Sequence, residues 1–256
     1  MKKLFITNLL IVFSLISFAK GYQTNYTSAG TSHNVTFELG KWDIQEVSLG
    51  GVTYSQIVFG TTTVTEKKGW AQLPFISASV QIAADKDYDV SVIDAAYKDY
   101  QLSYPLVPSR GVIYRNQDPE TIPYQIASES LVDAFYPSEL ATADSPYIIR
   151  DVRGTAVRVF PFRYNTVTNT LRVYSNMTVQ LSENTDTPTN PLYNTNLTPL
   201  REMEDMYQSL FINYSKSRMD LPVAQFGDIL VIYTARDQEA IQPYITWKKE
   251  MGYNVQ

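Results

Sequence analysis

The residue types that most often serve as nucleophile and general base are scarce in this chain. Its 256 residues include no cysteine and one histidine, His33. A Cys–His pair is therefore impossible, and a Ser–His–Asp triad would need that one histidine in the right place. Because His33 lies beside Asn34 in a polar stretch, we interpret it as an exposed or hydrogen-bonded side chain. We predict no catalytic residue in this chain.

Carboxylates at alternate positions suggest a calcium site at first sight. Asp85, Asp87 and Asp89 alternate along the sequence. A calcium-binding loop also needs a glycine at its sharp turn and a distal glutamate, and both are missing here. We therefore interpret the three aspartates as a solvated strand edge. The sequence also has no zinc-ligand spacing and no glycine-rich phosphate loop, so we predict no metal and no cofactor.

Two arginines lie in residues 105–146, a stretch with many prolines and weak hydrophobic periodicity. This pattern predicts long loops over a sheet, and structured loops often carry function. The two residues are Arg110 and Arg115. A guanidinium presents a planar fork that pairs with a carboxylate through two hydrogen bonds, so an acidic pocket would recognise it. The residues alone favour the simpler interpretation of Arg115 as a solvated loop cation.

The composition excludes several classes of protein. Hydrophobic residues make up 44% of the chain and aromatic residues 13%, which is enough for a core. Charged residues make up 18%, too few for a disordered chain or a coiled coil. The 21 lysines and arginines are outnumbered by 26 aspartates and glutamates, for a net charge of −5. Since no basic excess can neutralise phosphates, we predict that the chain does not bind nucleic acid.

The start of the chain has the layout of a secretory signal peptide. Two lysines precede an almost uncharged apolar run over residues 4–19, which ends in small residues suited to a cleavage site. This run is short for a bilayer span of about 20 residues. We predict that residues 1–19 are removed by cleavage between Ala19 and Lys20. The chain is then expected in the periplasm and afterwards at the cell surface or outside the cell, with no membrane attachment.

Short runs of alternating polar and apolar residues dominate from residue 35 to about residue 181. Residues 35–39, 76–82 and 171–174 show the period of two that is typical of strands with one solvated face. Glycines and prolines separate the runs, and long helical patterns are missing between them. Residues 20–182 are therefore predicted to form a mainly β domain, an antiparallel β-sandwich or jelly-roll-like fold.

The pattern changes after residue 182. Residues 183–196, rich in threonine, asparagine and proline, predict a flexible connector. From Thr198 to Tyr214, apolar residues recur on one helical face, and Pro199 suits the first helical position. We predict that residues 183–218 are a linker and a helix.

A third pattern occupies residues 219–256. A continuous apolar run at residues 229–233 predicts a strand covered on both faces, and helical spacing follows over residues 237–251. A strand followed by a helix is how an α/β parallel sheet begins, and one such unit cannot bury its own faces. We expect this segment to be the truncated start of an α/β domain.

Several segments resemble the N-terminal prodomain of the gingipain family of secreted bacterial cysteine endopeptidases. The resemblance runs from about residue 69 to the end of the chain as an ordered set of motifs, and it is densest over residues 106–181. The motifs are PSRGVIYR at 108–115, DPETIPY at 118–124, YPSELAT at 136–142, IRDVRG at 149–154, PFRYN at 161–165, TLRVY at 170–174 and FINY at 211–214. The apolar run at residues 229–233 and Trp247-Lys248 resemble the start of the catalytic domain.

The resemblance implies a prodomain that covers the active site of the peptidase and keeps the enzyme latent. In arginine-specific members a prodomain arginine enters the specificity pocket like a substrate. The matching position is Arg115, and Arg110 is the nearby competitor. The family's maturation site matches Arg218, which implies cleavage between Arg218 and Met219. The implied partner is the catalytic domain in the same polypeptide, whose catalytic residues would lie beyond Gln256.

Two alternatives stay open at this point. An exported β-sandwich adhesin or carbohydrate-binding module would suit the aromatic content, since aromatic rings stack on sugars. Such a module would have no use for the strand and helix predicted in residues 228–256. The parent protein could instead be a sortase-like or maturation peptidase of the same family with a different pocket. Arg115 favours arginine specificity without establishing it.

Overall fold

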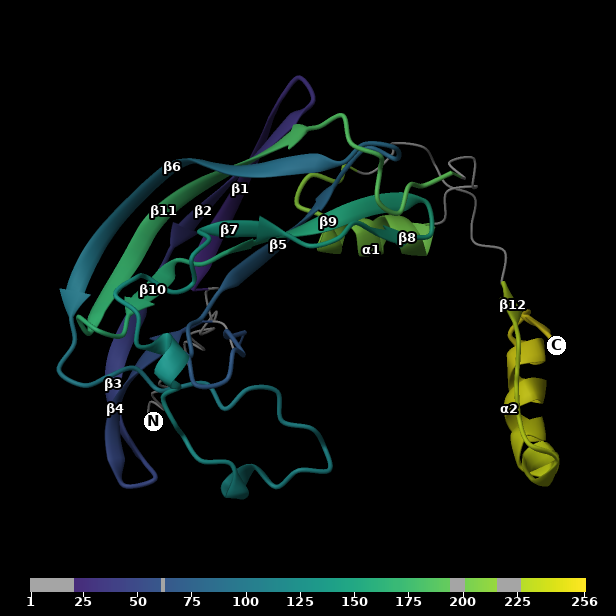
Figure 1. Ribbon diagram of the computed structural model, residues 1–256. Helices are drawn as coiled ribbons and strands as arrows, with labels where there is room; N and C mark the ends of the chain where they lie inside the picture. Colours follow the sequence, from purple (N-terminus) through teal and green to yellow (C-terminus); the bar gives the residue numbers. More distant parts are fainter. Residues whose placement is uncertain (1–20, 61–62, 194–200, 216–226) are drawn as a thin grey trace, which may run out of the picture.

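The structure, a computed structural model, describes residues 21–60, 63–193, 201–215 and 227–256. Antiparallel β-strands are its dominant elements, which confirms the predicted mainly β fold (Figure 1). Both predicted cleavage positions, Ala19–Lys20 and Arg218–Met219, lie outside the described residues. None of the helices in the described ranges combines the length and the apolar character needed to cross a bilayer.

A five-stranded antiparallel sheet is built around one long strand, residues 170–183. Its strands are β1 (Tyr22–Ala29), β2 (Ser32–Leu39), β6 (Tyr88–Gln101), β10 (Phe162–Asn165) and β11 (Thr170–Glu183). β11 pairs with β6 along one side and with β2 and β10 along the other, and β1 pairs with β2. The alternation in the sequence decides which face is buried, because successive strand residues point to opposite faces.

A second sheet and a hairpin make up the rest of the antiparallel β structure. They comprise β3 (Trp42–Leu49), β4 (Val52–Phe59), β5 (Ile76–Gln81), β7 (Ala141–Ala143), β8 (Tyr147–Ile149) and β9 (Val152–Val159). β9 is the central strand of the second sheet and pairs with β5, β7 and β8, while β3 and β4 form the separate hairpin. Figure 1 shows the second sheet lying alongside the five-stranded sheet.

The main hydrophobic core lies between the two sheets. It combines buried side chains of β2 and β11 in the five-stranded sheet with those of β5 and β9 in the second sheet. Its members include Val35, Phe37, Ile76, Val80, Val157, Val159, Met177, Val179 and Leu181. A second cluster packs the base of the β3–β4 hairpin against β10 and β11 through Ile57, Phe162 and Leu171. With no cysteine available for disulfides, burial of these side chains is the main source of stability.

Residues 105–146 are mostly loops, as their prolines predict. The short 3-10 helices η1 (Pro119–Thr121) and η2 (Ser128–Ser130) and strand β7 interrupt them. The beginning of this stretch differs from the prediction, because Leu106 and Val107 are buried. The N–H of Val107 donates to the carbonyl of Ser55 at 3.0 Å, which anchors the stretch to β4.

The part of the predicted flexible connector that the structure describes, residues 183–193, is held in place. β11 continues to Glu183, and the N–H of Leu192 donates to the carbonyl of Ala84 at 2.8 Å. The main anchor is Arg153 of β9, which is 1% exposed. Its guanidinium donates to the carbonyl oxygens of Thr189 and Asn190 at 2.6 and 3.0 Å. Hydrogen bonds that the composition does not reveal therefore fix this segment.

The same guanidinium also binds the turn between β5 and β6. It donates to the carbonyls of Ala83 and Lys86 at 2.8 and 2.5 Å and pairs with the carboxylate of Asp87 at 2.6 Å. Burial by itself raises the pKa of the Asp87 carboxyl, but hydrogen bonds from the Thr189 N–H and from Arg153 outweigh it and keep that pKa below its ordinary value. Arg153 thus joins three segments that are far apart in the sequence.

Helix α1 (Arg201–Leu210) and the residues after it pack on the second sheet. Most of the predicted apolar face within the described residues packs there, because Met203, Tyr207 and Phe211 join one cluster with β8 and β9. Leu210 of the same predicted face is instead 37% exposed. A Cβ at Gly154 would lie 2.2 Å from the ring of Phe211, so only glycine leaves room for that ring. The helix is thereby an integral part of the β body.

A parallel strand pair and a helix form the C-terminal part of the chain. The elements are β12 (Asp228–Ile229), η3 (Ala235–Asp237), α2 (Gln238–Glu250) and β13 (Asn254–Val255). β12 and β13 pair in parallel, as the predicted strand–helix pattern requires. The strand predicted over residues 229–233 is shorter, and Leu230 and Ile232 are 72% and 87% exposed. These side chains have no cover among the described residues.

Candidate functional site

The loop of residues 110–127 leaves the β body and returns to the point from which it started. The N–H of Gly69 donates to the carbonyl of Ser109 at 2.8 Å, and the N–H of Ala127 donates to the carbonyl of Gly69 at 2.9 Å. The N–H of Ser109 also donates to the carbonyl of Trp70 at 2.7 Å. Both ends of the loop are therefore fixed at Gly69. Figure 1 shows this loop projecting away from the two sheets.

Only glycine fits at position 69, because the backbone φ is positive and there is no room for a Cβ. Its φ is +78°, and a Cβ there would lie 2.5 Å from the Cβ of Ala127 and 2.8 Å from its backbone nitrogen. We expect Gly69→Ala to destabilise the protein by about 2–4 kcal/mol, because backbone strain and overlap at the base of the loop add together. Urea unfolding at equilibrium measures this loss.

Gly30→Ala is the matched control for this substitution. Gly30 has a φ of +62°, and no atom lies within 4 Å of the position of its Cβ. The control should lose only about 1 kcal/mol, the cost of the backbone conformation alone. Equal losses in the two variants would show that the contact between Gly69 and Ala127 does not hold the loop closed.

The structure separates the two candidate arginines of this loop. A guanidinium nitrogen of Arg110 donates to the carbonyl of Pro119 at 2.6 Å. The guanidinium carbon also lies 4.5 Å from the centre of the Tyr124 ring. Arg110 therefore stabilises the loop through contacts within it and has a structural role. A pocket on a partner would have to break these contacts in order to bind it.

Arg115 lies in a tight turn of the same loop. The N–H of Gln117 donates to the carbonyl of Tyr114 at 2.9 Å, which makes Arg115 and Asn116 the two central residues of a β-turn. Arg115 is exposed, and so are its neighbours Val112 and Tyr114 at 57% and 65%. No hydrogen bond or ion pair within the described residues engages its side chain. The loop thus presents a free guanidinium on a fixed backbone.

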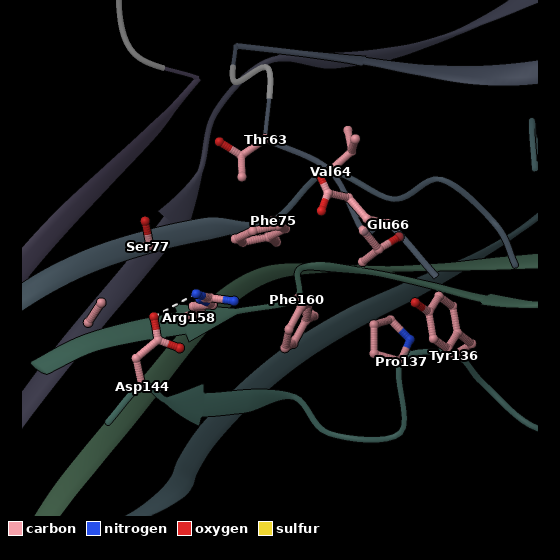
Figure 2. Close-up of a pocket in the computed structure, with 12 residues that line it drawn as sticks. Thr63, Val64, Glu66, Phe75, Ser77, Tyr136, Pro137, Asp144, Arg158 and Phe160 are labelled. Carbon is pink, nitrogen blue, oxygen red and sulfur yellow. Dashed lines mark hydrogen bonds and ion pairs between the residues drawn. The ribbon is translucent and has the colours of Figure 1, made fainter. Parts of the chain in front are cut away.

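A cavity of about 620 Å³ lies on the outer face of β5 and β9. Figure 2 shows the lining residues Arg158 and Asp144 pointing toward each other, and an ion pair of 2.6 Å joins them. The rings of Phe75 and Phe160 also line it, with their centres 5.8 Å apart. The lining includes neither cysteine nor histidine, so the cavity offers no Cys–His or Ser–His pair for acyl transfer. Its guanidinium is already paired, in contrast to that of Arg115.

The histidine and the aspartates considered from the sequence make contacts within the protein that suit a structural role. Nδ1 of His33 and the hydroxyl of Tyr26 share a hydrogen bond of 2.7 Å, and burial lowers the pKa of His33. Asp87 pairs with Arg153, and Asp89 accepts a hydrogen bond from the side chain of Asn184. Across the described ranges, no group of three or more His, Cys, Asp or Glu side chains is placed to hold a metal ion.

Sequence reasoning did not find three residues that shape this loop and its support. The sequence pattern predicts no more for Gly69 than a break between strands, predicts nothing for Gln117, and contains Arg153 only as part of the motif at residues 149–154. A glycine between strand patterns marks a turn in general, but it does not identify the segments that Gly69 binds. No local pattern signals the partners of Arg153, since they lie 36 to 70 positions away.

Comparisons with known proteins agree on one family. The family model described as Propeptide_C25 matches residues 24–219. Gingipain R2 of Porphyromonas gingivalis is 34% identical over 209 residues, which cover 79% of this chain and 28% of that protein. Gingipain R1 of the same species is 35% identical over 188 residues, 73% of this chain and 19% of that protein. The chain thus spans less than a third of the length of these relatives.

The solved structures that resemble this chain include one prodomain complex. It is titled "Complex of Porphyromonas gingivalis RgpB pro- and mature domains". One chain of that structure superposes with a TM-score of 0.67 at 30% sequence identity, covering 75% of this chain and 98% of that chain. A structure of gingipain K from the same species, at 21% identity and a TM-score of 0.56, shares the fold.

Proposed function

The chain belongs to the Propeptide_C25 family, and we propose that residues 20–218 are the inhibitory propeptide of a gingipain-type cysteine endopeptidase. The parent enzyme cleaves after arginine, and the propeptide keeps it latent and aids its folding. Relatives of the arginine-specific type support this proposal, since Gingipain R2 and Gingipain R1 match at 34% and 35% identity. The alternative of an adhesin or carbohydrate-binding module is not favoured.

The presentation of Arg115 carries the proposal. Its guanidinium is exposed, unpaired within the described residues, and mounted on a loop whose two ends are tied to Gly69. A specificity pocket that accepts arginine needs an acidic group, and the planar fork pairs with a carboxylate through two charge-assisted hydrogen bonds. Because the loop is already ordered, binding costs little conformational entropy. Arg115 therefore occupies the pocket as a substrate side chain would.

The partner we propose is the catalytic domain of the same polypeptide. The similar RgpB structure is titled as a complex of pro- and mature domains. Residues 219–256 would begin the catalytic domain, because their parallel strands and helix have the pattern of an α/β sheet. The exposed Leu230 and Ile232 would be covered by further strands and helices of that domain.

Export follows from the proposed role, since gingipain-type enzymes act outside the cytoplasm. The basic start and apolar run of residues 1–19 support a signal peptide with cleavage between Ala19 and Lys20. The chain would pass through the periplasm to the cell surface or beyond. Inhibition of an arginine-specific gingipain by residues 20–256 tests the central proposal, and an absence of inhibition at micromolar concentration would overturn it.

We expect maturation to cut the chain between Arg218 and Met219. The family model ends at residue 219. The sequence around Arg218 is a polar stretch between the two predicted domains, and segments that link domains are preferred sites of proteolysis. Mass spectrometry of the mature secreted enzyme should find Met219 at its N-terminus. A different mature N-terminus would contradict this assignment and would leave the role of Arg115 untouched.

A further inference from the structure

Gln117 stabilises the turn that carries Arg115 through two hydrogen bonds, one from its backbone and one from its side chain. The backbone N–H of Gln117 donates to the carbonyl of Tyr114 at 2.9 Å. The side-chain Oε1 of Gln117 accepts a hydrogen bond from the N–H of Tyr114, also at 2.9 Å. Both backbone polar groups of Tyr114 are therefore bound by Gln117. The peptide bond between Arg115 and Asn116 lies at the centre of the ring that these contacts close.

The segment after the turn is fixed as well. Asp118 caps the 3-10 helix η1, because its Oδ1 accepts the N–H of Glu120 at 3.0 Å. The hydroxyl of Thr121 donates to the carbonyl of Asp118 at 2.8 Å, and Arg110 binds the carbonyl of Pro119. The chain on the C-terminal side of Arg115 is thereby attached to the body of the loop independently of the Arg115–Asn116 bond.

We propose that Gln117 is a positioning residue that makes the Arg115 loop a poor substrate while leaving it a good ligand. This inference rests on the proposed function of Arg115. The side chain of Arg115 projects from the turn and can enter a pocket, but the backbone on either side is folded back by Gln117. Peptide cleavage needs the carbonyl of the reacting bond to be aligned with the attacking group at about 3–3.5 Å. A closed turn opposes that alignment.

The same contacts oppose the release of the cleaved chain. Acylation would break the bond between the carbonyl carbon of Arg115 and the nitrogen of Asn116. The sulfur of the enzyme's cysteine would join the carbon, and a proton would join the leaving amine. Water would then break this thioester, its hydroxyl joining the carbon and its proton returning to the sulfur. In the acyl-enzyme that precedes hydrolysis, the amine of Asn116 would stay close to the Arg115 carbonyl because Gln117 and Asp118 hold it. A retained amine has a high effective concentration and re-forms the peptide bond in competition with water.

The test compares cleavage with binding. Residues 20–256 carrying Gln117→Ala are mixed with an excess of a mature arginine-specific gingipain, and cleavage at Arg115–Asn116 is followed by mass spectrometry. We expect cleavage about tenfold faster than in the unmodified chain, since loss of one hydrogen bond opens the turn by roughly that factor. Inhibition at the earliest times should stay within about threefold, because Arg115 is unchanged.

Two further variants serve as controls. Gln117→Glu keeps an oxygen that accepts the N–H of Tyr114 and should be cleaved as slowly as the unmodified chain. Gln125→Ala removes the same type of side chain from an exposed position of the same loop and should also leave the cleavage rate unchanged. An unchanged cleavage rate in Gln117→Ala would overturn the inference. Such a result would leave the proposed function intact. The proposed function is overturned by a different result, namely that the unmodified chain does not inhibit the enzyme.

Discussion

Arg115→Ala should weaken inhibition of an arginine-specific gingipain between about thirtyfold and several thousandfold. This range corresponds to ~2–5 kcal/mol, the usual effect of truncating one partner of a buried, hydrogen-bonded charge pair. Much of that loss would arise on the enzyme, where the proposed acidic group of the pocket would be left desolvated and unpaired. The rest of the contact surface would continue to bind, so inhibition should be weakened without being abolished.

We expect the same substitution to have little effect on the stability of the free protein. Arg115 is exposed and makes no hydrogen bond or ion pair within the described residues. The turn that carries it is held by Gln117 and Tyr114, whose contacts do not involve the Arg115 side chain. The midpoint of thermal unfolding should therefore stay within about 2 °C, since substitutions at such surface positions usually change stability by less than ~0.5 kcal/mol. Weaker inhibition can then be attributed to the pocket contact.

Inhibition constants for three variants give the measurement. Arg115→Lys keeps the charge without the planar fork, and it should fall between the unmodified chain and Arg115→Ala. Arg158→Ala is the matched arginine control, because its ion pair with Asp144 is partly exposed and lies in the cavity of Figure 2. We expect no change in its inhibition constant. If Arg115→Ala inhibits as strongly as the unmodified chain, the pocket-binding role of this arginine is wrong.

The elements with strong local patterns were predictable from the sequence. Alternation in residues 35–39 and 76–82 placed strands where β2 and β5 occur, and Val35 and Val80 are indeed fully buried. The helical spacing of Met203 and Tyr207 identified the face of α1 that packs on the second sheet, and Phe211 directly after the helix joins the same cluster. These patterns succeed because strand and helix periods determine which side chains share a face.

The way in which distant segments meet was not predictable. The exposed position of Arg115 depends on Gly69, which binds residues 40 and more positions away at Ser109 and Ala127. Residues 183–196 read as a flexible connector because composition describes propensity alone, whereas hydrogen bonds from Arg153 hold part of this segment. The short β12 differs for a related reason. A buried parallel strand forms fully when neighbours cover both faces, and Leu230 and Ile232 have no cover among the described residues.

Arg153→Met should lower the free energy of unfolding by about 3–5 kcal/mol. The guanidinium is buried and donates to four carbonyl oxygens and to the carboxylate of Asp87. Methionine fills a similar volume but offers no donor, so these acceptors lose their partner in a site that admits little water. The segment of residues 184–192 would detach from β9 in the folded state. Urea unfolding of residues 20–256 measures the effect.

Arg158→Met separates this loss from the general effect of removing an arginine. Its ion pair is 43% exposed on the arginine side, and exposed pairs contribute ~0–1 kcal/mol. A loss below about 1 kcal/mol for Arg153→Met as well would mean that Arg153 does not hold the three segments together. Protease digestion offers a second measurement, because residues 184–192 should be cut faster in the Arg153 variant alone.

At acidic pH, the difference in unfolding free energy between Arg153→Met and the unmodified chain should become smaller. The pKa of Asp87 is held below its ordinary value of 3.8 by hydrogen bonds from Thr189 and Arg153 that outweigh burial. A lowered carboxyl pKa adds stability above about pH 4 and loses it as the pH falls toward the lowered value, because the unfolded chain binds the proton first. The Arg153→Met variant lacks the part of this pH-dependent stabilisation that comes from Arg153. The gap in unfolding free energy should therefore narrow between pH 5 and pH 2, and a constant gap would show that the neutral carbonyl contacts of Arg153 carry all of its contribution.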